Sequence, residues 1–273
     1  MTLPTTLGAL HLDTIDVPAT TRAPVLCLHG LFAGSWVFER LLPVLAQRGY
    51  PAAALSFRGH PPSASVPQLG RVTIGDFLDD ATEAARALDR PIVVGHSLGG
   101  LVAQMLAARG LVRAAVLVAA APPRGIGVLT KPLLKRMPRY LPALLASRPF
   151  LPRAEDLDAL VLNCVPPADR AAARARLVAD SGRAARQAAL GKYAVPKRSV
   201  RVPILVVSGE DDRFIPLDVA RRIARRYDAP LLVARGHGHF LLAEPGWEDQ
   251  VRVVIDWLDD LPHRDEPVAP AAD

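Results

Sequence analysis

The sequence has only two cysteines in 273 residues, Cys27 and Cys164. Two such distant thiols give neither a disulfide framework nor the paired spacing of a zinc site. Cys27 lies inside an apolar run, so we expect it to be a buried free thiol. This use of cysteine fits a protein of a reducing compartment.

Long apolar runs and targeting signals are also missing. No run is long enough to span a bilayer, and Met1 to Leu10 lacks the basic start and apolar core of a secretory signal. The net charge is +6, from 33 basic and 27 acidic residues, without interleaved basic and aromatic residues. We therefore expect a cytoplasmic protein without a nucleic-acid partner and without stable membrane insertion.

Apolar runs alternate with amphipathic segments along most of the chain. Half of the residues are hydrophobic, which permits one large domain with an insertion. The alternation predicts a parallel sheet covered by helices on both faces, an α/β fold. Residues 7–17 are expected to form a first strand or a hairpin. The other expected strands are 24–28, 51–57, 91–94, 114–121, 203–208 and 230–234, and the expected helices are 36–48, 73–88, 101–109, 217–227 and 248–261.

Regularity lapses between residues 124 and 198, where prolines interrupt short helical segments. We interpret 124–198 as a helical cap inserted into a core made of 1–123 and 199–262. Residues 263–273 form a polar tail rich in proline and alanine, which is typical of disorder. The cap carries an excess of ten positive charges, and the rest of the chain has a net charge of −4.

The sequence Gly95-His96-Ser97-Leu98-Gly99 stands between an expected strand and an expected helix. In that context the pattern G-x-S-x-G predicts a nucleophile elbow, a sharp turn that exposes the Ser97 hydroxyl. The two glycines remove Cβ atoms that would clash around the turn. The alternative is a glycine-rich turn whose serine only caps the helix.

With this elbow and the motifs that follow it, the chain resembles the α/β-hydrolase fold superfamily, in particular its capped serine esterase, lipase and lysophospholipase-like members. The resemblance covers most of the chain apart from the cap and the tail. It implies a mostly parallel sheet of about eight strands, helices on both faces and an inserted helical cap. It also implies the chain order nucleophile, acid, base.

Gly209 to Pro216 resembles the acid turn of that superfamily, with a carboxylate four residues before the proline. This spacing favours Asp212 over Asp211, although a solvated acidic loop is the alternative. Some members take the acid from the end of the strand after the elbow helix. The corresponding stretch, Val118 to Pro123, has no carboxylate.

Two histidines compete for the role of base. His239 precedes an apolar run and is followed by Glu244 and Pro245, which resembles the spacing in the superfamily. His237 would then be a partly exposed loop residue. Metal binding by the His-x-His pair is the remaining alternative, but no third ligand lies nearby in the sequence.

The resemblance assigns the oxyanion hole to the backbone N–H groups of Leu31 and Leu98. His29 is expected to be structural, and His96 to pack at the elbow. Phe32 and Trp36 either line the pocket or belong to the core. The loop Arg58-Gly59-His60 departs from the usual pattern, because Pro61-Pro62 replaces a glycine-rich continuation and Ser56 stands where aspartate is common.

The expected function is hydrolysis of a carboxylic ester through an acyl-enzyme on Ser97, with His239 as base and Asp212 as orienting acid. The mechanism requires neither metal nor organic cofactor. The partner would be a small-molecule ester, with acyl lipids among the candidates. The same triad also serves thioesterases, acyltransferases, carbon–carbon bond hydrolases and cofactor-free perhydrolases, and a non-catalytic receptor is a further alternative.

The sequence leaves the acyl chain length open, and both a monomer and a homodimer are compatible with it. The basic cap suggests weak contact with anionic lipid surfaces, and the alternative is a solvated lid whose arginines reflect codon bias.

Overall fold

A single sheet forms the centre of the computed structural model, which describes residues 2–128 and 130–262. Its strand order is β1-β2-β4-β3-β5-β6-β9-β10. The pairs β1/β2 and β2/β4 are antiparallel and all other neighbouring strands are parallel. The expected mostly parallel sheet of about eight strands is confirmed. The strands are β1 (Thr6–Leu7), β2 (Leu10–Ile15), β3 (Val25–Leu28), β4 (Ala52–Ser56), β5 (Ile92–His96), β6 (Ala114–Val118), β9 (Ile204–Gly209) and β10 (Leu231–Ala234).

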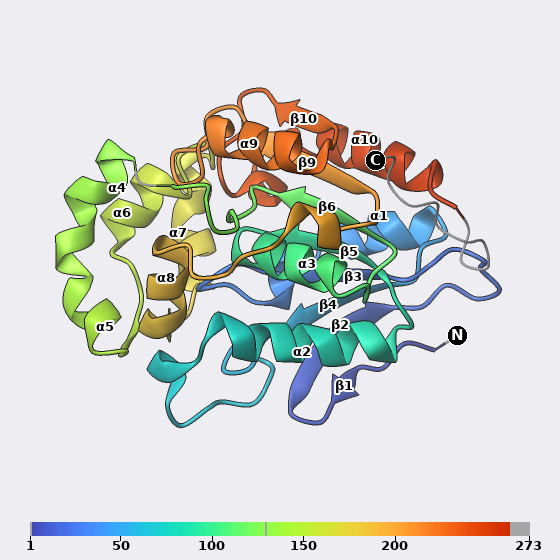
Figure 1. Ribbon diagram of the computed structural model, residues 1–273, viewed down its shortest axis with the longest axis horizontal. Helices are drawn as coiled ribbons and strands as arrows, with labels where there is room; N and C mark the ends of the chain where they lie inside the picture. The colour runs from blue at the N-terminus through green and yellow to red at the C-terminus, as the bar shows by residue number, and fades with distance from the viewer. Residues whose placement is uncertain (1, 129, 263–273) are drawn as a thin grey trace.

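Helices cover both faces of this sheet (Figure 1). Because successive side chains of a strand point to opposite faces, each strand contributes to two separate cores. Leu26 and Leu28 of β3 belong to the core under α2 (Ile74–Ala87), α3 (Leu98–Ala108) and α9 (Leu217–Tyr227). Val25 and Cys27 belong to the core under α1 (Leu41–Gln47) and α10 (Trp247–Asp259). Burial on both faces explains why these strands read as continuous apolar runs.

Local signals fix several helix boundaries. Helix α9 occupies the expected range, and α2 begins with a reciprocal capping box between Thr73 and Asp76. The expectation of one helix over 36–48 is wrong. This stretch is split into the short 3-10 helix η1 (Ser35–Phe38) and α1, because Pro43 has no N–H and is tolerated only in a first helical turn.

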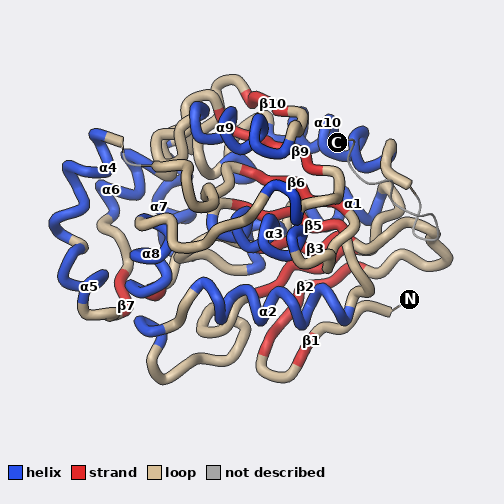
Figure 2. Tube along the Cα trace, in the orientation of Figure 1, coloured by secondary structure: helices blue, strands red, loops and turns tan. Residues whose placement is uncertain are grey.

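The described residues of 124–198 form short helices connected by turns and loops (Figure 2). The two short strands within them pair in antiparallel fashion. The division into core and cap stays a prediction, and the tail 263–273 lies outside the described residues. The elements of this segment are α4 (Lys131–Arg136), η3 (Met137–Arg139), α5 (Leu141–Leu145), β7 (Pro149–Phe150), α6 (Ala154–Leu160), α7 (Pro167–Ala175), β8 (Asp180–Ser181), α8 (Gly182–Ala189) and η4 (Lys197–Ser199); η2 (Leu69–Arg71) and η5 (Leu241–Ala243) lie outside it.

Within 2–128 and 130–262, every helix is too short or too polar to cross a membrane. The cytoplasmic location stays a prediction.

Cys27 provides a chemical test of the central position of β3. Its side chain is fully buried, and burial raises the pKa of its thiol, whereas Cys164 is partly exposed. We expect an aromatic disulfide reagent to react with one thiol in the native protein and with two after denaturation. The Cys164→Ser variant should show no native reaction and one thiol in denaturant. Rapid labelling of this variant without denaturant would contradict the placement of Cys27.

Candidate active site

Ser97 lies at a sharp turn between strand β5 and helix α3, with φ 53° and ψ −117°. This left-handed backbone is strained for a residue other than glycine, and such strain clusters at functional sites. A Cβ on Gly95 would lie 2.4 Å from the Gly99 carbonyl oxygen, and one on Gly99 would lie 2.1 Å from the Leu28 carbonyl oxygen. The two glycines therefore allow the strand and the helix to approach closely enough to form the elbow, as the motif suggested.

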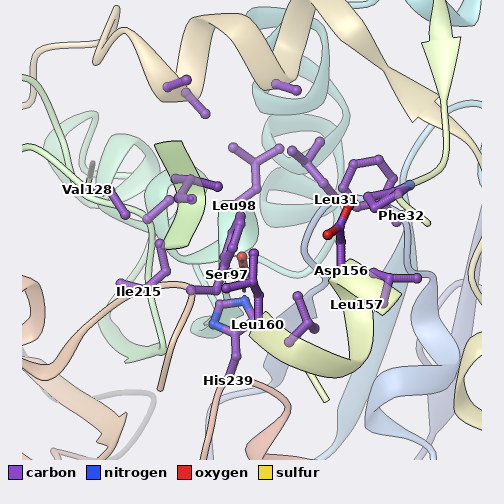
Figure 3. Close-up of a pocket in the computed structure, with 18 of the residues that line it drawn as sticks. Leu31, Phe32, Ser97, Leu98, Val128, Asp156, Leu157, Leu160, Ile215 and His239 are labelled. Atoms are coloured by element: carbon purple, nitrogen blue, oxygen red, sulfur yellow. Dashed lines mark hydrogen bonds between the residues drawn. The ribbon is translucent and has the colours of Figure 1, made fainter. Parts of the chain in front are cut away.

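The structure brings Ser97, His239 and Asp212 together in one chain of hydrogen bonds. The Ser97 Oγ lies 3.1 Å from His239 Nε2, and His239 Nδ1 lies 2.8 Å from Asp212 Oδ2. Because a carboxylate only accepts, His239 must donate from Nδ1, which leaves Nε2 free to accept the serine proton. Figure 3 shows the His239 ring facing the Ser97 hydroxyl. All three side chains are buried.

Asp212 is held by the turn that follows β9. Its Oδ1 accepts hydrogen bonds from the N–H groups of Phe214 and Ile215, each at 2.8 Å. The other oxygen is thereby directed to His239. Asp211 is exposed and donates its backbone N–H to the His237 carbonyl. Of the two candidates for the acid, only Asp212 is hydrogen-bonded to His239 in the described chain.

The expectation that His237 is partly exposed is wrong. His237 is buried, and its Nδ1 lies 3.2 Å from Glu244 Oε2, which also accepts the Gly238 N–H at 2.7 Å. The buried Glu244 carboxylate is a hydrogen-bond partner for the His237 ring, which allows the ring to be buried. Burial raises the pKa of Glu244, although the Gly238 N–H and His237 act against this rise. Among the described residues, no group of three side chains is arranged to hold a metal ion.

His96 makes a contact that no sequence pattern indicated. Its Nε2 lies 2.9 Å from the backbone carbonyl oxygen of His239 and donates to it. Burial, together with the nearby His239, lowers the pKa of His96 to about 3. His96 is therefore neutral, and its N–H fixes the backbone of the residue expected to act as base.

The loop after β3 lies directly against the elbow, since a Cβ on Gly30 would be 2.8 Å from Ser97 Cβ. Within the described chain, the N–H groups of Leu31 and Leu98 donate to no protein acceptor. Both residues line the cavity above Ser97. The oxyanion role of these two N–H groups stays a prediction, and their free donors are compatible with it.

His29 braces the same loop. Its Nδ1 donates to the Gly30 carbonyl over 2.7 Å, and its Nε2 accepts the Phe57 N–H over 3.1 Å. Burial, with a smaller contribution from His60, lowers the pKa of His29 to about 3. A neutral ring with one donor and one acceptor fits the structural role expected from the sequence.

Asp180, from the segment 124–198, clamps the residue after Leu31. The Phe32 N–H donates to Asp180 Oδ2 over 2.8 Å, and the Phe32 carbonyl accepts the Val178 N–H over 2.8 Å. Phe32 has φ +67°, so its conformation depends on these external bonds. The segment 124–198 thus holds the loop that carries the Leu31 N–H.

His60 is the counter-ion of Asp180. Its Nε2 lies 3.0 Å from Asp180 Oδ2 and its Nδ1 lies 3.1 Å from the Arg58 carbonyl oxygen. Both partners only accept, so the ring carries two protons and a positive charge. Burial alone would lower the pKa of His60, but the hydrogen bond and charge of Asp180 outweigh it and raise this pKa. Burial alone would raise the pKa of Asp180, but the hydrogen bond and the charge of His60 oppose burial, and the pKa of Asp180 is lowered.

A cavity of about 200 Å³ opens above the Ser97 hydroxyl. Phe32 lines it, whereas Trp36 packs against Phe240 and Arg176. The walls are mostly apolar and come from both the sheet loops and the segment 124–198. They include Leu31, Leu98, Val128, Leu133, Met137, Leu144, Phe150, Leu157, Leu160, Leu177, Ala185, Ala188 and Ile215.

Comparison with known proteins finds similarity both in sequence and in fold. Residues 25–254 match the sequence model described as the Alpha/beta hydrolase family. The esterase PIR7B of Oryza sativa subsp. japonica is 32% identical over 134 residues, or 45% of this chain and 48% of the rice protein. The chain thus spans about half the length of this relative.

Two solved structures share the fold. The monoacylglycerol lipase of Paleococcus ferrophilus superposes with a TM-score of 0.69 at 19% identity, covering 91% of this chain and 98% of the lipase. The esterase RhEst1 of Rhodococcus sp. ECU1013 gives a TM-score of 0.68 at 24% identity, covering 93% of this chain and 95% of the esterase.

We expect Asp180→Asn to destabilise the protein by about 3–5 kcal/mol, because it leaves a buried cation without its partner. The pKa of His60 is raised on folding, so its contribution is complete below about pH 6.5 and is lost as the pH rises through the raised value. The pKa of Asp180 is lowered, so its contribution is present above about pH 4. Urea unfolding should therefore show a larger difference from wild type at pH 6 than at pH 9.

Asp158→Asn is the matched control, since Asp158 pairs with Arg174 at the partly exposed surface of the same segment. Its cost should be about 0–1 kcal/mol. A difference between wild type and Asp180→Asn that does not vary with pH would contradict a charged His60.

Proposed function

The chain belongs to the alpha/beta hydrolase family, and on that premise we propose that it hydrolyses carboxylic esters through an acyl-enzyme formed on Ser97. One observation carries the proposal: a buried Ser97–His239–Asp212 hydrogen-bond chain ends at the floor of an apolar cavity. A serine that merely caps a helix needs neither a hydrogen-bonded imidazole nor a carboxylate behind it. Here the Ser97 side chain makes no capping hydrogen bond to α3.

In the first step, His239 Nε2 takes the proton of the Ser97 hydroxyl while Oγ attacks the acyl carbon of the ester. The imidazolium that forms is stabilised by Asp212, which stays ionised and fixes the ring through Nδ1. The backbone N–H groups of Phe214 and Ile215 hold that carboxylate in place. No rotation of the base is needed, because His239 Nε2 already faces Ser97 Oγ while Nδ1 is bound to Asp212.

The attack turns the carbonyl oxygen into an oxyanion, which the Leu31 and Leu98 N–H groups stabilise. These donors cost little reorganisation, because Leu98 begins helix α3 and the Asp180 clamp on Phe32 holds the Leu31 loop. His239 then passes its proton to the leaving alcohol as the carbon–oxygen bond breaks. Water, deprotonated by the same imidazole, hydrolyses the acyl-enzyme and regenerates Ser97.

The cavity favours an uncharged, apolar substrate. Arg136 and Asp156 are the charged side chains of its cap wall, and they neutralise one another through Arg136 Nε and Asp156 Oδ1 at 2.9 Å. Asp156 also accepts from Arg139 and from the Tyr140 hydroxyl. Among the described residues of that wall, this leaves no free cation to pair with an acidic substrate. Acyl chains of small to medium length suit the volume best.

Hydrolysis of p-nitrophenyl esters from acetate to palmitate tests the proposal. Wild type should turn over these esters with an optimum at short to medium chains. Ser97→Ala should lose at least about 10³-fold in kcat, because the covalent route is closed. Circular dichroism of Ser97→Ala checks that the fold is retained. Equal turnover by the two proteins, or none by wild type at any chain length, would contradict ester hydrolysis at Ser97.

Ala188 of α8 lines the cavity and offers a test of its role in selecting the acyl chain. We expect Ala188→Leu to lower kcat/KM for the long esters about tenfold relative to acetate, because the added methylenes fill space that a long chain needs. Ala172→Leu on the exposed face of α7 is the matched control. A uniform loss of kcat/KM across all chain lengths would mean that Ala188 does not select for the length of the acyl chain.

A further inference from the structure

Exposed leucines are concentrated on one part of this molecule. Six large hydrophobic side chains of the described residues are strongly exposed, and five of them lie in the segment 124–198. A monomeric protein rarely leaves such side chains clustered in water unless they contact something. The six are Leu134, Leu141, Leu145, Leu151, Leu190 and Val253.

The leucines at 134, 141 and 145 belong to one run of helical turns. Elements α4, η3 and α5 follow each other between Lys131 and Leu145 and lie at the edge of the molecule farthest from α10 (Figure 1). The three side chains recur at spacings of seven and four residues along this run and are all strongly exposed. None of the three lines the cavity.

Neighbouring side chains of the same turns are already in use. Leu133, Tyr140 and Leu144 each precede one of the exposed leucines by one residue, and together with Met137 they line the cavity above Ser97. Lining the cavity explains why these side chains are apolar, but it does not explain the exposed leucines at 134, 141 and 145. A wall only one helix thick separates the cavity from whatever covers those leucines.

Unpaired cations accompany the outer leucines. Lys131 and Lys135 flank Leu134, and Arg148 follows Leu145 after one turn. All three are exposed, and none forms an ion pair within the described chain. Arg136 and Arg139 of the same run, in contrast, are bound to Asp156. The face thus combines protruding apolar groups with positive charges that have no internal partner.

We propose that this outer cap face, made of Leu134, Leu141, Leu145, Lys131, Lys135 and Arg148, docks on an anionic lipid surface. The leucines enter the boundary between headgroups and acyl chains, and the cations meet the negative headgroups. A second copy of the chain is a poorer occupant, because two-fold pairing would set these cations against each other. Docking goes beyond ester hydrolysis, and binding alone can test it.

The experiment is co-sedimentation of the full chain with vesicles of phosphatidylcholine alone and of phosphatidylcholine mixed with phosphatidylglycerol. We expect wild type to bind the mixed vesicles and to dissociate as salt is added. The triple variant Leu134→Ser, Leu141→Ser, Leu145→Ser should bind at least about tenfold more weakly, and Lys131→Gln, Lys135→Gln, Arg148→Gln likewise. Leu190→Ser, at a side chain that is 76% exposed, is the matched control and should bind like wild type.

Folding and activity are measured separately from docking. The triple leucine variant should keep its melting temperature and its turnover of soluble p-nitrophenyl acetate, since its leucines do not line the cavity. Absence of wild-type binding to the mixed vesicles would overturn the proposal, as would equal binding to both vesicle types. A wild-type dimer that the triple leucine variant converts to a monomer, without vesicle binding, would assign the face to self-association instead.

Discussion

The close passage of helix α3 across strands β3 and β5 is the constraint on which the site depends. The backbone at Gly99 approaches the Leu28 carbonyl within a distance that any Cβ would block, and Gly95 and Gly99 meet in the same way. Only this approach lets Ser97 stand in a strained left-handed conformation with its hydroxyl exposed to the cavity. Gly30 then brings the loop that carries the Leu31 N–H against Ser97. The position of Ser97 is therefore set by close backbone contacts that a side chain at these glycines would block.

The second requirement is a link between the segment 124–198 and the loop after β3. Asp180 supplies it by accepting the Phe32 N–H, and His60 on the core side neutralises its charge. A buried carboxylate without a counter-ion would be too costly to keep. The segment is thus more than a cover for the cavity. Removing it would leave His60 unpaired and would release the loop that presents the Leu31 N–H.

Sequence patterns predicted those features that depend on neighbours along the chain. The range of α2, the bounds of α9 and the sheet class follow from local periodicity. The spacing before Pro216 singled out Asp212, which the structure joins to His239. One missed feature arises from a distant contact, because Asp180 meets Phe32 across 148 residues. The burial of His237 was missed although Glu244 lies only seven residues away, because no periodicity pairs the two side chains. To predict the break between η1 and α1, the position of Pro43 is needed in addition to the apolar pattern.

Several imidazoles crowd this site, so proximity alone does not select a base. The ring centroids of His96 and His239 are only 5.0 Å apart. The His96 N–H donates to the His239 carbonyl, and both ring nitrogens of His29 are hydrogen-bonded to backbone groups. His60 gives both protons to acceptors and has no lone pair left. Within the described chain, His239 alone joins a carboxylate at one nitrogen to a serine hydroxyl at the other. Hydrogen bonding, rather than sequence position or distance, therefore decides which histidine can take the proton of Ser97.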